Sequence, residues 1–137
     1  MANNNLPFIT RTPDYSDLDL DFIRHPKTNQ LVLKHGKDAV IRSVRNLVFT
    51  NYYDRPFQSG IGSNVRDILF DNFTPTTILI LQDAIYNVLN EYEPRVEVQN
   101  VKATENIDKN GFDITISFII LNRSEPVITS IFLERIR

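Results

Sequence analysis

The sequence predicts an α+β fold in which three helices pack on an antiparallel sheet with a long C-terminal β-hairpin. The middle of the chain, residues 37–93, repeats its apolar residues with the 3.6-residue period of a helix. The last third, residues 96–136, alternates apolar and polar residues with the period of a strand. An Asp-Lys-Asn-Gly run at residues 108–111 separates two of these alternating stretches, and Asn-Gly is typical of a tight hairpin turn.

The length of 137 residues is that of one domain, which we expect to span residues 16–137. The polar residues 1–15 contain two prolines, which oppose a helix, so we expect an irregular N-terminal arm there. Over residues 16–22 leucine and phenylalanine alternate with aspartate, which predicts a strand with one buried apolar face. A turn is expected at residues 25–29, and residues 30–34 are expected to return as a second short strand.

Three amphipathic segments predict the helices. The first, residues 37–50, places apolar side chains on one face and arginines on the other. The second is a short helix over residues 63–70, for which Ser63 is the expected N-cap. The third follows the N-cap Thr74 with a proline at its first position, and it ends before Pro94.

The last third of the chain predicts three strands. A bulge near Asn100 reconciles the two apolar registers of the first strand. The second strand covers residues 112–120, and its outward face becomes apolar at Ile119 and Leu121. The third strand, residues 127–136, is apolar on both faces. Because a sheet covered on both faces loses its alternation, we expect this end of the sheet to be covered twice, by a helix of this chain or by another protein.

The composition excludes several classes of function. The net charge of −2 provides no general nucleic-acid surface, so we expect no nucleic-acid partner. The absence of cysteine excludes disulfides, thiolate zinc sites and cysteine nucleophiles. The N-terminus lacks the basic and apolar regions of a signal peptide, and no apolar stretch is long enough to span a membrane. We therefore expect no membrane partner either.

The carboxylates and histidines give no pattern of a catalytic or metal site. Glu91 and Glu93 lie two residues apart on the third helix, where side chains point roughly 200° apart, so their spacing forms no glycosidase pair. His25 and His35 lack the i, i+4 spacing of metal ligands. The aspartates of residues 16–22 lack the glycine and glutamate that a calcium loop requires. We therefore expect no catalytic residue, metal or cofactor.

Two short segments combine proline and arginine with a further anchoring residue. One is Asp54-Arg55-Pro56-Phe57, and the other is Glu93-Pro94-Arg95 at the junction of the third helix and the sheet. Glu93 can pair with an arginine, and Arg95 can reach the C-terminal carbonyls of the helix. Each segment is either a rigid corner or a docking site, since arginine forks and aromatic rings are typical interface anchors. The two interpretations have equal weight.

Several motifs in a fixed order carry a family resemblance. They are Ile41-Arg42-Ser43-Val44-Arg45-Asn46-Leu47, Thr50-Asn51 with Arg55-Pro56-Phe57, Gly60-x-Gly62 with Leu69-Phe70-Asp71, and Tyr92-Glu93-Pro94-Arg95-Val96. The chain resembles the baseplate wedge proteins of contractile phage tails, also called sheath initiators, which have relatives in type VI secretion baseplates. The resemblance covers roughly residues 15–136, and Glu-Pro-Arg is the hallmark of this family. One departure is Asp71, where the family often has glutamate.

The resemblance implies a structural protein without enzymatic activity, located in the tail baseplate of the virion and assembled in the host cytoplasm. It implies other wedge subunits and the tail sheath protein as partners, with tail tube and hub proteins as further candidates. It assigns Glu93, Pro94 and Arg95 to contacts with the wedge core, to which we add Arg55, Pro56 and Phe57 from the first docking segment. It assigns residues 127–137 to sheath initiation. Because some members carry a lysozyme-like label, a peptidoglycan-cleaving hydrolase is the alternative, and a general adaptor outside any tail is a third.

The pattern of the last strand independently favours strand addition. A terminal strand has an edge to which a foreign strand can pair, and charges or prolines usually block such edges. Here charges cluster only at the tip of the chain. The residues that remain available are Val127, Ile128, Thr129, Ser130, Ile131, Phe132 and Leu133. Six added backbone hydrogen bonds at about 1 kcal/mol each would contribute roughly 6 kcal/mol before the costs of association.

Overall fold

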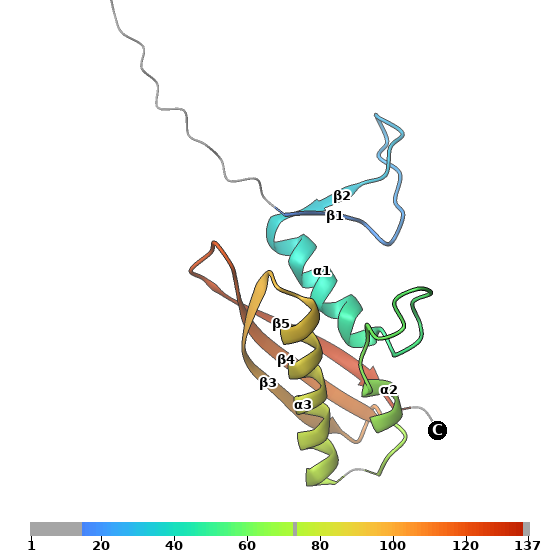
Figure 1. The fold of residues 1–137 in the computed structure, drawn as a ribbon, viewed down its shortest axis with the longest axis vertical. Coiled ribbons are helices and arrows are strands. Elements are labelled where there is room, and N and C mark those ends of the chain that lie inside the picture. The colour runs from blue at the N-terminus through green and yellow to red at the C-terminus, as the bar shows by residue number, and fades with distance from the viewer. Residues whose placement is uncertain (1–14, 73, 136–137) are drawn as a thin grey trace, which may run out of the picture. The chain divides into compact units, whose positions relative to one another are not determined.

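The computed structural model describes residues 15–72 and 74–135 (Figure 1). The chain divides after Ala39 into two compact units, which are described separately below. The predicted N-terminal arm lies outside the described residues except for Tyr15. The single domain expected over residues 16–137 stays a prediction.

The N-terminal unit is a small β-hairpin. Strand β1 (Ser16–Leu18) pairs antiparallel with β2 (Leu33–His35). The turn expected at residues 25–29 is present, with the backbone N–H of Asn29 donating to the His25 carbonyl over 3.0 Å. Beside the strands, the buried carboxylate of Asp19 lies 3.6 Å from the ammonium group of Lys34.

The prediction of one buried apolar face over residues 16–22 was wrong. The strand ends at Leu18 because the chain turns at once, and the N–H of Phe22 donates to the Asp19 carbonyl over 3.0 Å. After this turn the alternation no longer corresponds to one face. The side chains of Leu18, Leu20 and Phe22 are each about half exposed or more.

Among the described residues the structure has three helices, as the sequence predicts: α1 (Gly36–Phe49), α2 (Val65–Ile68) and α3 (Pro75–Tyr92). The N-cap of α3 is confirmed, because the hydroxyl of Thr74 accepts a hydrogen bond from the N–H of Thr77 over 3.1 Å. Helix α2 is shorter than expected and its N-cap is Asn64. The Ser63 hydroxyl instead donates to backbone carbonyls at the end of α1, those of Val48 in its last turn and of Thr50 directly after it.

The C-terminal part of the chain forms an antiparallel sheet in the order β3-β4-β5. Its strands are β3 (Val96–Asn106), β4 (Gly111–Ile120) and β5 (Pro126–Glu134). The register shifts between Val98 and Asn100, which confirms the predicted bulge. Asn110 takes the positive φ of 50° expected in the turn before β4. Strand β5 ends two residues before the predicted Ile136, which lies outside the described residues.

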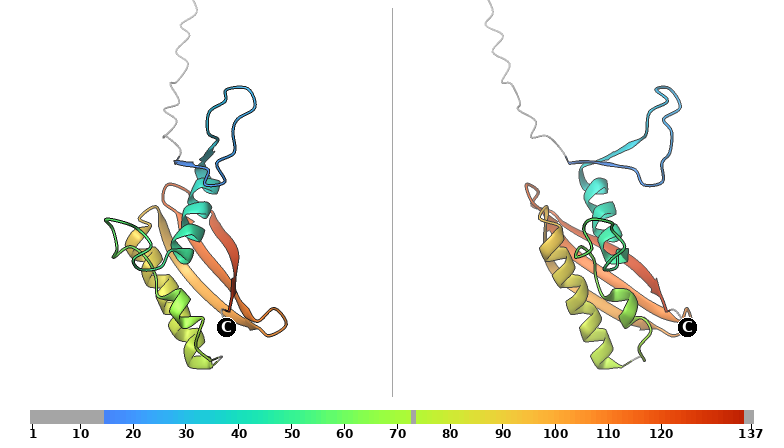
Figure 2. Two further views of the ribbon diagram at one scale, coloured as in Figure 1. Left: turned by 90° about the vertical axis from the view of Figure 1, so that its right-hand side faces the viewer. Right: turned by 45° about the vertical axis from the view of Figure 1, so that its right-hand side comes forward.

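The core of this unit lies between the helices and one face of the sheet. Figure 2 shows α3 and the later part of α1 on the same side of the sheet. The side chains turned toward them are fully or almost fully buried on all three strands, and on β4 they are Phe112, Ile114, Ile116, Phe118 and Ile120. No helix in the described part of the chain is long and apolar enough to cross a membrane.

The opposite face of the sheet tests one of the two covers that the sequence left open. We expected both faces of the β4–β5 end to be covered, but no helix of residues 15–72 and 74–135 lies on this face. Ile128 is therefore 70% exposed, and Leu121 and Phe132 are partly exposed. A helix of the described chain does not provide the second cover. Another protein remains the cover that the pattern predicts.

Candidate docking surfaces

The Glu93-Pro94-Arg95 segment is a tight corner between α3 and β3. The backbone N–H of Glu93 caps α3 by donating to the Leu89 carbonyl over 3.0 Å. The Val96 N–H then donates to the Glu93 carbonyl over 3.2 Å, which closes the turn. Pro94 stands exposed between these two bonds. The corner thus turns the chain from helix into strand within three residues.

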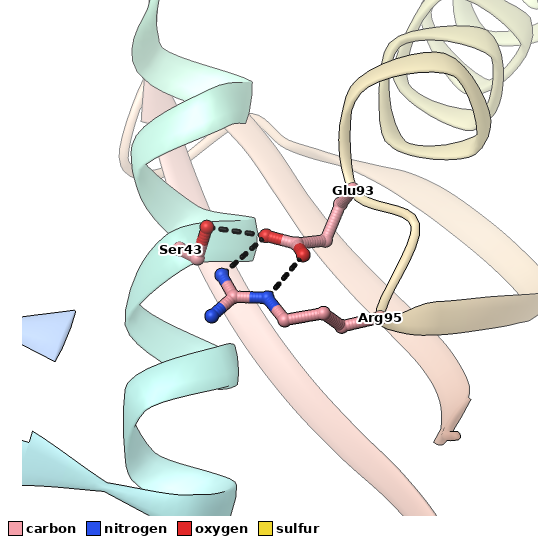
Figure 3. Close-up of polar contacts among 3 residues, drawn as sticks. All are labelled: Ser43, Glu93 and Arg95. Atoms are coloured by element: carbon pink, nitrogen blue, oxygen red, sulfur yellow. Dashed lines mark hydrogen bonds and ion pairs between the residues drawn. The ribbon is translucent and has the colours of Figure 1, made fainter. Parts of the chain in front are cut away.

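The side chains of this corner form a buried polar cluster with α1, shown in Figure 3. Glu93 is only 2% exposed. Its carboxylate accepts two bonds from the Arg95 guanidinium, from Nε over 2.6 Å and from Nη2 over 2.9 Å. It also accepts a bond from the Ser43 hydroxyl on α1. We call these three residues the corner cluster, and it fastens α1 to the junction of α3 and β3.

The charges of the corner cluster stabilise the ionised carboxylate. Burial raises the pKa of Glu93, but the bonds from Arg95 and Ser43 and the charge of Arg95 outweigh it. The net pKa of Glu93 therefore lies below its ordinary value of 4.5. Since the folded-state pKa is lowered, the stability that Glu93 contributes is present above pH 4.5 and is lost as the pH falls through the lower, folded-state pKa.

The other predicted docking segment lies on a loop between α1 and α2. Phe57 is fully exposed, and Arg55 and Pro56 are exposed beside it. Phe57 and Tyr53 both have φ of 69°, a left-handed conformation that is an outlier for a bulky aromatic residue. Backbone in this conformation persists only where its surroundings hold it, and it is enriched at functional sites.

Gly62 and three hydrogen bonds hold this loop in place. A Cβ atom at Gly62 would lie 2.5 Å from the backbone carbonyl carbon and oxygen of Asn51, so only glycine fits there. The carboxylate of Asp54 accepts bonds from the backbone N–H of Asn51 over 2.9 Å and from its side chain over 3.1 Å. At the far end, the hydroxyl of Tyr92 donates to the Gly60 carbonyl over 2.9 Å. This last bond ties the loop to the end of α3, directly before the corner cluster.

The predicted docking residues thus fall into two groups, those exposed on the surface and those engaged inside the molecule. Arg55, Pro56 and Phe57 are available to a partner, as is Pro94. Glu93 is engaged inside the molecule, and Arg95 is largely directed at it. Sequence reasoning identified Glu93 as a partner for an arginine. It missed Ser43, because a contact across 50 residues leaves no local pattern.

The third candidate surface is the side of β5 that faces away from β4, which we call the outer edge. Within the described residues no strand pairs with it. The Arg135 N–H donates to the Asn110 carbonyl over 2.9 Å, and hydrogen-bonded pairs alternate along an antiparallel ladder. By this alternation Ile128, Ser130 and Phe132 turn their N–H and C=O groups to the outer edge.

Glu91 and Glu93 do not form a catalytic pair. A glycosidase needs a carboxylic acid with a raised pKa across a cleft from a second carboxylate. The pKa of Glu93 is lowered, and its side chain is buried in an ion pair. Glu91 is exposed on α3. Among the residues that the structure describes, no three acidic or histidine side chains are grouped to hold a metal ion.

The fold is shared with a tail protein and with chains of two baseplates. A putative tail lysozyme from Geobacter sulfurreducens has a TM-score of 0.72 at 18% identity, over 78% of this chain and 97% of that one. A chain of the anti-feeding prophage baseplate has a TM-score of 0.71 at 20% identity, over 82% and 90%. A chain of the postcontracted pyocin R2 baseplate has a TM-score of 0.53 at 14% identity, over 87% and 99%.

Sequence comparison identifies the family. Baseplate wedge protein gp25 of Enterobacteria phage T4 is 24% identical over 113 residues, which are 82% of this chain and 85% of that protein. The model of the family "Baseplate wedge protein gp25" matches residues 34–125. The chain therefore belongs to the baseplate wedge protein gp25 family. The α+β fold and the family resemblance predicted from the sequence are confirmed.

Proposed function

We propose that this protein is a non-enzymatic structural subunit of a tail baseplate that docks on the wedge core and initiates the sheath by strand addition to β5. Its partners are other wedge subunits and the tail sheath protein, with tube and hub proteins as further candidates. It works in the virion, after assembly in the host cytoplasm. The observation that carries the proposal is the outer edge of β5. This strand is long and lies at the edge of its sheet, and the chain belongs to a family of baseplate proteins.

The outer edge has the chemistry of a template for a foreign strand. Between Val127 and Leu133 three residues turn outward and offer six N–H and C=O groups, and no charged side chain lies in this stretch. A proline and a charged residue, Pro126 and Glu134, turn outward only at the two ends of β5. Monomeric proteins usually block such an edge with charges or proline. Strand addition gives affinity through these backbone groups. Copies arranged around a baseplate would add the gain of multivalency to each modest contact.

The docking part of the proposal rests on the loop and the corner. The corner cluster holds Pro94 in place, and the Tyr92–Gly60 bond holds the loop that presents Phe57. An exposed aromatic ring on a rigid loop loses little conformational entropy when it binds, which suits an interface anchor. Glu93 and Arg95 act in this proposal mainly by fixing the surface, with Arg55, Pro56, Phe57 and Pro94 as the residues that touch the wedge core.

Substituting Ser130→Pro tests the strand addition. Proline removes an N–H that points to the outer edge, while the bonds between β5 and β4 remain, and proline is tolerated on edge strands. We expect the free energy of unfolding to change by about 1 kcal/mol or less. In tails assembled with this variant, electron microscopy should show baseplates and tubes without a polymerised sheath.

The matched control is Glu105→Pro on β3, the other edge of the same sheet. Glu105 is exposed, and by the same alternation its N–H points away from β4. This control should assemble sheaths of normal length. Normal sheaths on Ser130→Pro tails would contradict strand addition to β5.

Substituting Phe57→Asn tests the docking loop. Asparagine tolerates the left-handed backbone of this position, so the fold should be unaffected. Loss of an aromatic anchor should weaken co-purification with wedge subunits about tenfold. The control is Ile107→Asn, an exposed apolar residue in the turn between β3 and β4. Equal capture of wedge subunits by both variants would remove Phe57 from the interface.

A further inference from the structure

A hollow of about 490 Å³ lies at the C-terminal end of β5. It is lined by the end of α1, by α2 and by three consecutive residues of β5, namely Phe132, Leu133 and Glu134. Successive strand residues point to opposite faces of a sheet. A hollow lined by three residues in a row therefore runs along the strand's edge, not beneath one face. Figure 1 shows β5 ending beside α2.

The floor of this hollow is apolar. Val48 of α1, Val65 of α2, Leu69 directly after α2 and Leu133 of β5 line it, and all four are at most 5% exposed. The polar residues of the lining are Asn51, Arg66 and Glu134. Phe49, at the end of α1, is half exposed and forms part of the rim. A hollow with these walls favours an aliphatic or aromatic group, and its volume is within the range of 300–1,000 Å³, the approximate size of specific binding pockets.

A strand added at the outer edge would lie about 4.8 Å from β5. Its side chains on the helix-facing side would continue the layer that contains Leu133, and they would meet Val48 of α1, Val65 of α2 and Leu69 directly after α2. Resting on the strand addition proposed above, we infer that this hollow receives an apolar side chain of the incoming strand. The partner segment is therefore an extended strand with an aliphatic or aromatic residue at the inward position near Leu133, and the hollow fixes its register.

Photo-crosslinking from the rim tests this occupant. Benzoylphenylalanine is placed at Phe49 in assembled tails, and the crosslinked peptide is identified by mass spectrometry. The expected product is a crosslink to an apolar residue within an extended segment of the sheath protein. A crosslink to a wedge subunit, to a second copy of this chain or to no protein overturns the inference.

Substituting Phe49→Gln measures the effect on assembly. We expect the fraction of sheathed tails to fall about tenfold, because the substitution removes an aromatic side chain that would contact the partner at the rim of the hollow. The matched control is Phe70→Gln, since Phe70 is 52% exposed against 51% for Phe49 and does not line the hollow. Thermal unfolding of both variants accompanies the assay.

If Ser130→Pro abolishes the sheath while Phe49→Gln matches Phe70→Gln, strand addition holds and the hollow is not a register pocket. If Ser130→Pro leaves the sheath intact, the proposed function itself fails.

Discussion

Substituting Glu93→Ala is expected to lower the free energy of unfolding by about 3 kcal/mol, which is the low end of the cost of removing one partner from a buried ion pair. The low end applies because the Arg95 side chain is 23% exposed and can recover some hydration. The substitution leaves its guanidinium facing an apolar methyl group and removes the acceptor of the Ser43 hydroxyl. Urea denaturation followed by circular dichroism measures the change.

The matched control for this prediction is Glu97→Ala, an exposed carboxylate on β3, which should change the stability by less than about 0.5 kcal/mol. The combined variant Glu93→Leu/Arg95→Met removes both charges and should lose less stability than Glu93→Ala alone. The lowered pKa of Glu93 adds a pH signature. The native protein should lose stability below pH 4.5 more steeply than Glu93→Gln. Equal stability of Glu93→Ala and Glu97→Ala at pH 7 would show that the corner cluster does not hold the fold.

Substituting Gly62→Ala is expected to destabilise the protein by about 2 kcal/mol, a typical cost of forcing a methyl group into filled space. The new Cβ would lie 2.5 Å from the Asn51 carbonyl and 2.7 Å from the Tyr52 nitrogen. Both are backbone atoms, so the chain itself must move. Because this contact positions the loop that carries Phe57, co-purification with wedge subunits should weaken as well.

The control for Gly62 is its neighbour in the Gly-x-Gly motif. A Cβ atom at Gly60 would meet no atom within 4 Å, so Gly60→Ala should leave the melting temperature unchanged or raise it slightly. Differential scanning calorimetry compares the two variants. If both melt at the same temperature, the close approach of Gly62 to Asn51 does not constrain the loop.

The features that the sequence predicted well are those with local chemical causes. The ends of α3 follow from Thr74 and Pro94, because a cap and a proline act on their immediate neighbours. The turn before β4 follows from Asn110 and the glycine after it. The bulge near Asn100 follows from a change of apolar register within one strand.

The features that the sequence did not predict depend on distant contacts. Ser43 joins the corner cluster across 50 residues, and although it lies in one of the family motifs, nothing in that motif indicates a contact with Glu93. The hollow beside β5 is lined by residues of three separate elements, α1, α2 and β5. The sequence pattern of any one of these segments therefore does not predict it. The apolar alternation that begins at Leu18 was misleading, because the turn after it depends on backbone bonds between Asp19 and later residues. Of the candidate sites, the edge strand was the easiest to predict from the sequence, because its position at the edge follows from the order of the strands alone.

The outer edge of β5 also has a cost for the subunit before assembly. Two free copies can pair their edges with each other, and misfolded chains can add to the same template, so a concentrated pool is prone to aggregate. A cell that stockpiles the subunit ahead of its neighbours would lose it to precipitation. We therefore expect the subunit to stay soluble best when it is produced at low levels and together with the components it assembles with.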